Sequence, residues 1–84
     1  MNERGESMDL VFYTREECEL CDKAWRLITE AGLAERLEIV HIDDDLDLIQ
    51  RYGDQIPVVR AEKTGEKLTW PFTASQVREL AERD

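Results

Sequence analysis

Hydrophobic residues gather in short segments along the chain, and their spacing predicts alternating strands and helices. A β-branched and aromatic run at residues 10–13 predicts the first strand. Residues 14–17, Thr-Arg-Glu-Glu, fit a helix capping box, and Gly32 ends the helix that follows. From Cys18 onwards the apolar positions of that helix recur at helical spacing: Leu20, Ala24, Leu27 and Ala31.

The middle of the chain is predicted to hold a second strand and a short helix. Residues 37–43 are rich in β-branched side chains. Because a helix separates them from the first strand, the two strands should run parallel with a right-handed crossover. Asp45 is expected to cap a short helix that ends at Gly53. The side chains expected to point inward from that helix are Leu48, Ile49 and Tyr52.

The last third of the chain is predicted to form a hairpin and a closing helix. A third strand is predicted over residues 56–59, starting at a proline, and a turn at residues 63–66 joins it to an antiparallel fourth strand at residues 67–70. Residues 73–76, Thr-Ala-Ser-Gln, form a second capping box. The apolar face of the helix behind it is Val77, Leu80 and Ala81. The predicted order is β-α-β-α-β-β-α, an α/β fold with a four-stranded mixed sheet flanked by helices.

Length and composition limit the chain to one domain. Its 84 residues bury too little surface for two cores, whereas the 42% hydrophobic share is enough for one. Residues 1–7 are polar and aperiodic, and we expect them to form a flexible tail ahead of a domain over residues 8–84. We expect this domain to be a monomer.

Charge and hydropathy argue against two classes of partner. Twenty acidic residues against eleven basic ones give a formal net charge of -9, which repels nucleic-acid phosphates and anionic lipids. No apolar run approaches the ~18 residues needed to cross a bilayer, and the N-terminus lacks the hydrophobic stretch of a signal peptide. We therefore expect a cytoplasmic protein with no nucleic-acid partner and no membrane partner.

The two cysteines, Cys18 and Cys21, form a Cys-x-x-Cys motif at the start of the first predicted helix. The unpaired N–H groups and the dipole of a helix N-terminus stabilise an anion, which favours the thiolate of Cys18. Cys21 lies one turn further on, where it can attack a mixed disulfide on Cys18. A structural disulfide across so short a loop would contribute only about 2 kcal/mol, against ~4 kcal/mol for long loops. The spacing favours reversible redox chemistry; the alternatives are two buried apolar residues or half of a metal site.

Taken together, the motifs resemble the thioredoxin superfamily and, within it, the short bacterial glutaredoxin-like proteins. The residues that carry the resemblance are Cys18-Glu-Leu-Cys21, Ile42-Asp-Asp44, Tyr52-Gly53, Ile56-Pro-Val58 and Trp70-Pro-Phe72. The resemblance covers about residues 9–83. It implies a thioredoxin-like fold in which Pro57 is a cis-proline packed beside the dithiol, and in which the backbone of Ile56 pairs with an extended substrate.

The sequence departs from ordinary glutaredoxins at the positions that hold glutathione. Glu19 and Leu20 replace Pro-Tyr between the cysteines, Ile56 stands where glutathione-binding relatives often carry Thr or Val, and no Gly-Gly-x-Asp segment follows the hairpin. Arg15 is the one candidate contact for a glutathione carboxylate. The charged residues around the thiols are Glu16, Glu17, Glu19 and Asp22 against Arg15, Lys23 and Arg26. Because this field is acidic, we expect a dithiol reductant rather than glutathione.

Several other residues have ordinary structural interpretations. His41, the only histidine, is expected to be a packed or partly exposed strand residue, and it would leave a zinc site on the cysteine pair one ligand short. Trp25 is expected to pack on its helix. Trp70 and Phe72 are expected to pack in the core and at a corner, with a substrate platform as the alternative. The aspartates at residues 43–45 are interpreted as a strand end and a helix cap rather than a cation site.

The leading hypothesis is a thiol-disulfide oxidoreductase that uses no cofactor and no metal, with protein or small-molecule disulfides as substrates. In it Cys18 attacks, Cys21 resolves, and Ile56 with Pro57 shapes the substrate groove. Two alternatives stay open: a binding module with little turnover, and a metal or cluster carrier that uses the cysteine pair across a dimer. A colourless, metal-free preparation would argue against the carrier, and failure to cycle with any reductant would favour the binding module.

Overall fold

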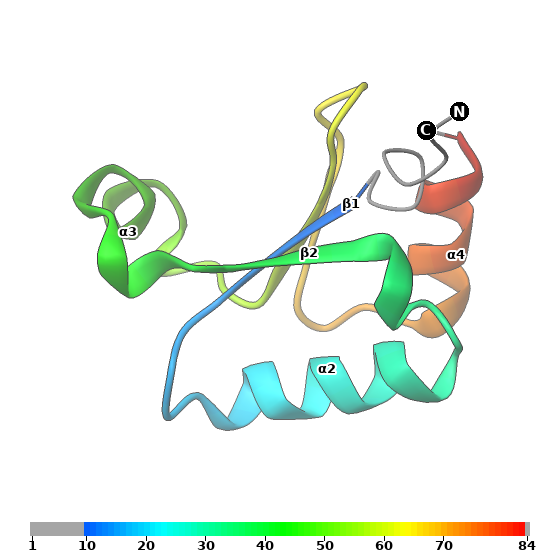
Figure 1. Ribbon diagram of the computed structural model, residues 1–84, viewed down its shortest axis with the longest axis horizontal. Coiled ribbons are helices and arrows are strands. Elements are labelled where there is room, and N and C mark those ends of the chain that lie inside the picture. Colours follow the sequence, from blue (N-terminus) through cyan, green and yellow to red (C-terminus); the bar gives the residue numbers. More distant parts are fainter. Residues whose placement is uncertain (1–9, 84) are drawn as a thin grey trace.

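The structure is a computed structural model that describes residues 10–83 (Figure 1). The predicted tail at residues 1–7 lies outside the described residues. The elements follow the predicted order: β1 (Leu10–Thr14), α2 (Glu19–Glu30), β2 (Leu37–His41), α3 (Leu46–Tyr52), β3 (Val58–Ala61), β4 (Lys67–Thr69) and α4 (Ala74–Arg83). Two short 3-10 turns, η1 (Ala34–Arg36) and η2 (Ile42–Asp44), flank β2.

The four strands form one mixed sheet in the order β2-β1-β3-β4. β1 pairs with β2 in parallel, as the crossover through α2 predicts, and with β3 antiparallel. β3 and β4 form the predicted antiparallel hairpin. The mixed sheet predicted from the sequence is therefore confirmed, with β1 in its interior.

Alternation along β1 divides the molecule into two layers. Leu10 and Phe12 point to the face that α2 and α4 cover, where they belong to the main apolar cluster with Ile28 and Leu80. Tyr13 points to the other face and stacks on Tyr52 of α3, with ring centroids 4.3 Å apart. Figure 1 shows α2 running along the sheet below β1 and β2, with α3 beyond the ends of these strands.

Helix α2 closes as its sequence predicts. Gly32 follows it with a φ of 76°, a left-handed conformation that glycine adopts without the strain that it imposes on residues with a side chain. The Leu33 N–H donates to the Ile28 carbonyl and so satisfies one of the last carbonyls of the helix. Leu33 is itself buried in the core, so the turn also fixes where the chain starts towards β2.

Five predicted strand boundaries were wrong, two of them for a clear local reason. β1 runs to Thr14 and β3 to Ala61, one and two residues beyond their predicted ends. β2 ends at His41 rather than at residue 43, because His41 lies opposite Thr14, the last residue of β1, and no partner continues beyond it. β3 begins after Pro57 rather than at residue 56, since proline has no N–H for the ladder. β4 ends at Thr69, one residue earlier than predicted.

The capping box predicted for the last helix is present and can be tested. The Gln76 N–H donates to the Thr73 hydroxyl at 3.1 Å, and the Gln76 side chain accepts from the Thr73 N–H at 2.8 Å. Thr73→Ala should therefore lower the free energy of unfolding by about 1 kcal/mol in urea denaturation. The matched control is Ser75→Ala, an exposed serine in the first turn of the same helix. Equal losses in the two variants would contradict a capping role for Thr73.

Candidate functional site

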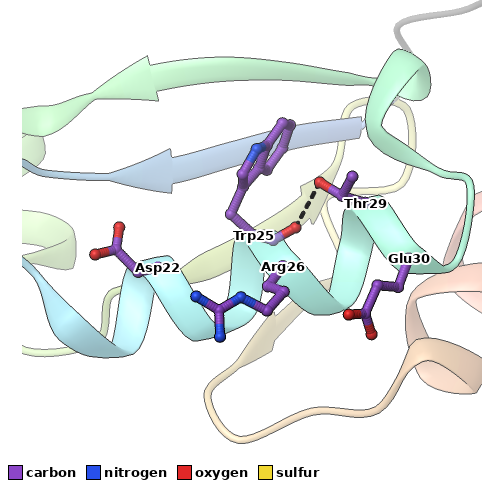
Figure 2. Close-up of a pocket in the computed structure, with 5 residues that line it drawn as sticks. All are labelled: Asp22, Trp25, Arg26, Thr29 and Glu30. Atoms are coloured by element: carbon purple, nitrogen blue, oxygen red, sulfur yellow. Dashed lines mark hydrogen bonds between the residues drawn. The ribbon is translucent and has the colours of Figure 1, made fainter.

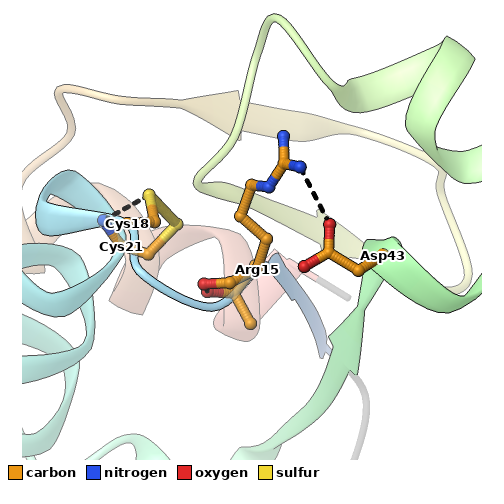
Figure 3. A network of polar contacts seen from close by, with 5 residues as sticks. Arg15, Cys18, Cys21 and Asp43 are labelled. Atoms are coloured by element: carbon orange, nitrogen blue, oxygen red, sulfur yellow. Dashed lines mark hydrogen bonds and ion pairs between the residues drawn. A yellow bond between two sulfur atoms is a disulfide. The ribbon is translucent and has the colours of Figure 1, made fainter.

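Cys18 is the N-cap of α2, so the capping box predicted at residues 14–17 was wrong. Thr14 belongs to β1, and its hydroxyl is directed at the Arg15 carbonyl, 3.5 Å away. The Cys18 sulfur instead accepts a hydrogen bond from the Cys21 N–H at 3.1 Å (Figure 3). Sequence reasoning missed this cap because thiols are not among the usual N-cap side chains. The Cys18 sulfur thus accepts a hydrogen bond from one of the N–H groups that the helix leaves unpaired.

A tight turn brings the chain from the end of β1 to this cap. It spans only three residues, and Glu17 within it has a φ of 56°. This left-handed conformation is unfavourable for a residue with a side chain, by roughly 1–2 kcal/mol. The turn places Cys18 just beyond the end of β1 and directly before the first residue of α2, Glu19.

The two cysteines are joined as a disulfide, and their burial differs. Their Cα atoms are 5.1 Å apart, well within the range that a disulfide spans. Cys21 is 2% exposed, whereas Cys18 is only partly buried. The helix geometry therefore leaves Cys18 as the more solvent-exposed of the two cysteines, as its position nearer the N-terminus predicts.

Pro57 lies beside the end of β1 that leads to the cysteines. Tyr13 pairs with Val58 in the antiparallel ladder, so the register continues with Thr14 opposite Pro57. The Ile56–Pro57 peptide bond is cis, as the resemblance implied, and the Pro57 side chain is buried. The Trp70–Pro71 bond is also cis, which the sequence did not indicate. Whether Ile56 pairs with a substrate stays a prediction.

Arg15 forms an ion pair with Asp43, which the sequence did not predict. The guanidinium Nη2 lies 3.0 Å from the Asp43 carboxylate, and Figure 3 shows the Arg15 side chain directed to it. Asp45, two residues on, caps α3 as predicted by accepting the Asp47 and Leu48 N–H groups. The helix cap predicted within residues 43–45 is therefore confirmed, whereas the strand end predicted there was wrong, because β2 ends at His41 and Asp43 and Asp44 belong to η2.

A cavity of about 260 Å³ opens between α2 and β2 beside the disulfide. Cys21 lines it, together with Trp25 of α2 and His41 at the end of β2. His41 is exposed, in agreement with its prediction as a partly exposed strand residue. The cavity had no sequence signal, because its lining residues come from three elements that only the fold brings together.

Trp25 lines both this cavity and a second depression along α2. The second one, about 570 Å³, lies along the polar side of α2 and reaches neither cysteine. Figure 2 shows the Trp25 ring directed to the sheet, while Arg26 and Glu30 point the other way. The ring packs against Phe12 of β1, with centroids 5.4 Å apart, so it covers the sheet and not only its own helix as predicted. Phe72 is buried and packs edge-on against the partly buried Trp70, as predicted for core and corner residues.

The far face of the sheet supports the segment that leads into Pro57. Lys67 of β4 donates to the Gln55 side chain at 2.8 Å and lies 5.5 Å from the Tyr52 ring centroid. Tyr52 in turn stacks on Tyr13, whose pKa is raised above its ordinary value mainly by burial and further by the neighbouring Tyr52. These contacts connect α3, β1 and β4 around residues 53–57.

Within residues 10–83, no group of three or more His, Cys, Asp or Glu residues is placed to hold a metal ion. Within the same residues, no helix is both long and apolar enough to cross a membrane.

Residues 9–82 match the family model described as Glutaredoxin-like domain (DUF836). The chain belongs to this glutaredoxin-like family. Target protein XcR50 from X. campestris is similar: its X-ray structure shares 37% identity and a TM-score of 0.75 over 89% of this chain and 97% of its own. Its solution structure gives 38% identity and a TM-score of 0.76 over 92% and 96%. No curated protein matches the chain.

More distant structures establish the fold of this glutaredoxin-like protein. Thioredoxin 1 from Thermosipho africanus TCF52B shares 16% identity, with a TM-score of 0.64 over 90% of this chain and 92% of its own. The oxidised thioredoxin from Plasmodium falciparum shares 17% identity, with a TM-score of 0.57 over 99% and 91%. The predicted thioredoxin-like fold is therefore confirmed, and together with the disulfide-bonded Cys18 and Cys21 it supports a redox role.

Trp25 should report the state of the disulfide by fluorescence. Its ring lines the same cavity as Cys21, which lies one helical turn away, so reducing the disulfide should change its emission. The chain has two tryptophans. The change should persist in Trp70→Phe, because that ring packs at Phe72, and should be lost in Trp25→Phe. A change that is lost in Trp70→Phe and persists in Trp25→Phe would contradict the assignment of the signal to Trp25.

Proposed function

We propose that this glutaredoxin-like protein is a thiol-disulfide oxidoreductase in which Cys18 attacks and Cys21 resolves. The observation that carries the proposal is the unequal burial of two bonded cysteines at one helix N-terminus. A nucleophile must meet its substrate, whereas a resolving thiol need only reach the first sulfur. Cys18 at the partly exposed cap suits the first role, and the buried Cys21 suits the second.

The reduced protein would transfer two electrons in two exchanges. The Cys18 thiolate attacks one sulfur of a substrate disulfide, forms a mixed disulfide, and releases the other substrate sulfur as a thiolate that takes up a proton. The Cys21 thiolate then attacks the Cys18 sulfur. That step forms the intramolecular disulfide and releases the second substrate thiol, so the substrate is reduced and the protein oxidised. A dithiol reductant restores the protein by the same two exchanges in reverse.

Helix α2 stabilises the anion in each exchange. Its unpaired N–H groups and its dipole favour negative charge at the cap, and the Cys21 N–H already donates to the Cys18 sulfur. The same donor remains in place when Cys18 becomes a thiolate or a leaving group. The Ile56–Pro57 segment lies beside the end of β1, next to the ladder between Tyr13 and Val58. This segment is proposed to shape the groove in which an extended substrate lies.

The two cysteines should behave differently when replaced one at a time. Cys21→Ser should accumulate a mixed disulfide with a small disulfide such as hydroxyethyl disulfide, because nothing resolves it. Cys18→Ser should remain unmodified, because the remaining thiol is 2% exposed. Intact mass spectrometry after equal incubation measures both. Equal trapping by the two variants would overturn the assignment of roles.

Glutathione is proposed to be a poor reductant for this site. It is anionic, and the residues around the cap are mostly acidic. Arg15, the candidate contact for its carboxylate, is held by Asp43 at 3.0 Å. A dithiol protein partner does not depend on such a contact, and it reduces the bond through an intramolecular second step.

Releasing Arg15 should improve the reaction with glutathione. Asp43→Asn breaks the ion pair and frees Arg15 to contact a glutathione carboxylate. An ion pair between partly exposed groups contributes up to about 1 kcal/mol, so the rate of disulfide reduction by glutathione should rise by up to about fivefold. Stopped-flow Trp25 fluorescence measures the rate. The matched control is Asp44→Asn, which removes the same charge one residue away. An equal rise in both variants would show a general charge effect and contradict a role for the ion pair.

A further inference from the structure

The cavity beside Cys21 and the proposed substrate groove lie on opposite sides of the end of β1. Thr14 lines the cavity and pairs with His41 of β2 on one side. On its other side the register places Thr14 opposite Pro57 of the chain leading into β3. The cavity and the Ile56–Pro57 segment are therefore on opposite flanks of the strand end that faces the cysteines.

The inner surface of the cavity is apolar and open to solvent. Phe12 and Trp25 form part of it, with their rings in contact. Ile39 of β2, a strand at the sheet edge, is the third apolar residue, and it is 46% exposed. A tryptophan ring with an open apolar neighbour is a surface on which the stem of a long side chain packs well.

The rim of the cavity is negatively charged. Glu16, Glu17 and Asp22 line it, and all three are exposed. Among the described residues that line the cavity, Arg15 is the single Lys or Arg, and its guanidinium is paired with Asp43 (Figure 3). The rim therefore favours a positive charge, which the face of the Trp25 ring also attracts.

We propose that this cavity binds the side chain of a lysine or arginine near the disulfide of a polypeptide substrate. The proposal rests on the proposed function and adds a substrate class to it. At about 260 Å³ the cavity falls below the roughly 300–1,000 Å³ typical of small-molecule pockets, which suits a single side chain. The alkyl stem packs on Trp25 and Ile39, and the cationic end meets the acidic rim.

The test compares disulfide-linked peptides that differ at one residue. Lysine, its uncharged analogue norleucine, or glutamate is placed in turn at each position flanking the cysteine. The reduced protein is mixed with each peptide, and release of peptide thiol is followed in a single turnover, so no other reductant is needed. At one position we expect lysine to react about tenfold faster than glutamate, with norleucine between them.

Two double variants separate the cavity from the overall charge of the protein. Glu16→Gln with Asp22→Asn neutralises two carboxylates of the rim. Glu79→Gln with Glu82→Gln removes the same charge from exposed positions of α4, outside the cavity. The ratio of lysine to glutamate rates should fall at least about threefold in the first and stay at the wild-type value in the second. Because the ratio compares two peptides on one variant, a change in Cys18 reactivity cancels.

The outcomes distinguish a failure of the side-chain site from a failure of the proposed oxidoreductase function. Equal rates for lysine and norleucine at every position would show that the cavity takes any apolar side chain and overturn the cationic preference. An equal fall of the ratio in both double variants would assign the preference to the general field and overturn the site. Turnover of every peptide at the same rate would overturn this inference alone. Absence of turnover with any peptide would overturn the proposed function and this inference with it.

Discussion

The site depends on where the pairings of β1 end. Thr14, the last residue of this strand, lies between His41 of β2 and the position of Pro57 before β3. The chain must leave the sheet at that point, and a three-residue turn with Glu17 in a left-handed conformation carries it to Cys18. One strand end thus sets the position of the helix cap, of the cis-proline and of the cavity on the other flank.

The helix that starts there gives two chemically identical side chains different surroundings. Residues three apart on a helix are neighbours, so both sulfurs are close enough to bond. The cap position is open, however, whereas one turn further in the side chain faces the core, with Ala24 and Ile28 on the same buried side. The attacking and resolving roles proposed for the pair follow from this difference in burial and from the N–H that Cys21 donates to the Cys18 sulfur.

Charge around the site has a pattern that the total of -9 does not reveal. Acidic residues border the cap and the cavity, and Arg15, which lines the cavity, has an acidic partner from the segment after β2. An exposed ion pair contributes little to stability. Its greater effect here is to leave the rim of the cavity without a free positive charge, which is why anionic and cationic ligands should be distinguished at this site.

The sequence by itself determined the order of elements, the parallel and antiparallel pairings and the redox pair. These follow from local signals: hydrophobic periodicity, the caps at Asp45 and Thr73, the glycine after α2, and the Cys-x-x-Cys spacing. The cis bond at Pro57 was implied only by the family resemblance. Tertiary structure decided the strand ends, because a strand stops where its partner stops, and it made Cys18 the cap in place of Thr14. It also decided the Arg15–Asp43 pair and the cavity lined by Trp25 and Ile39, since their residues are distant in the chain and meet only when β1, β2 and α2 pack together.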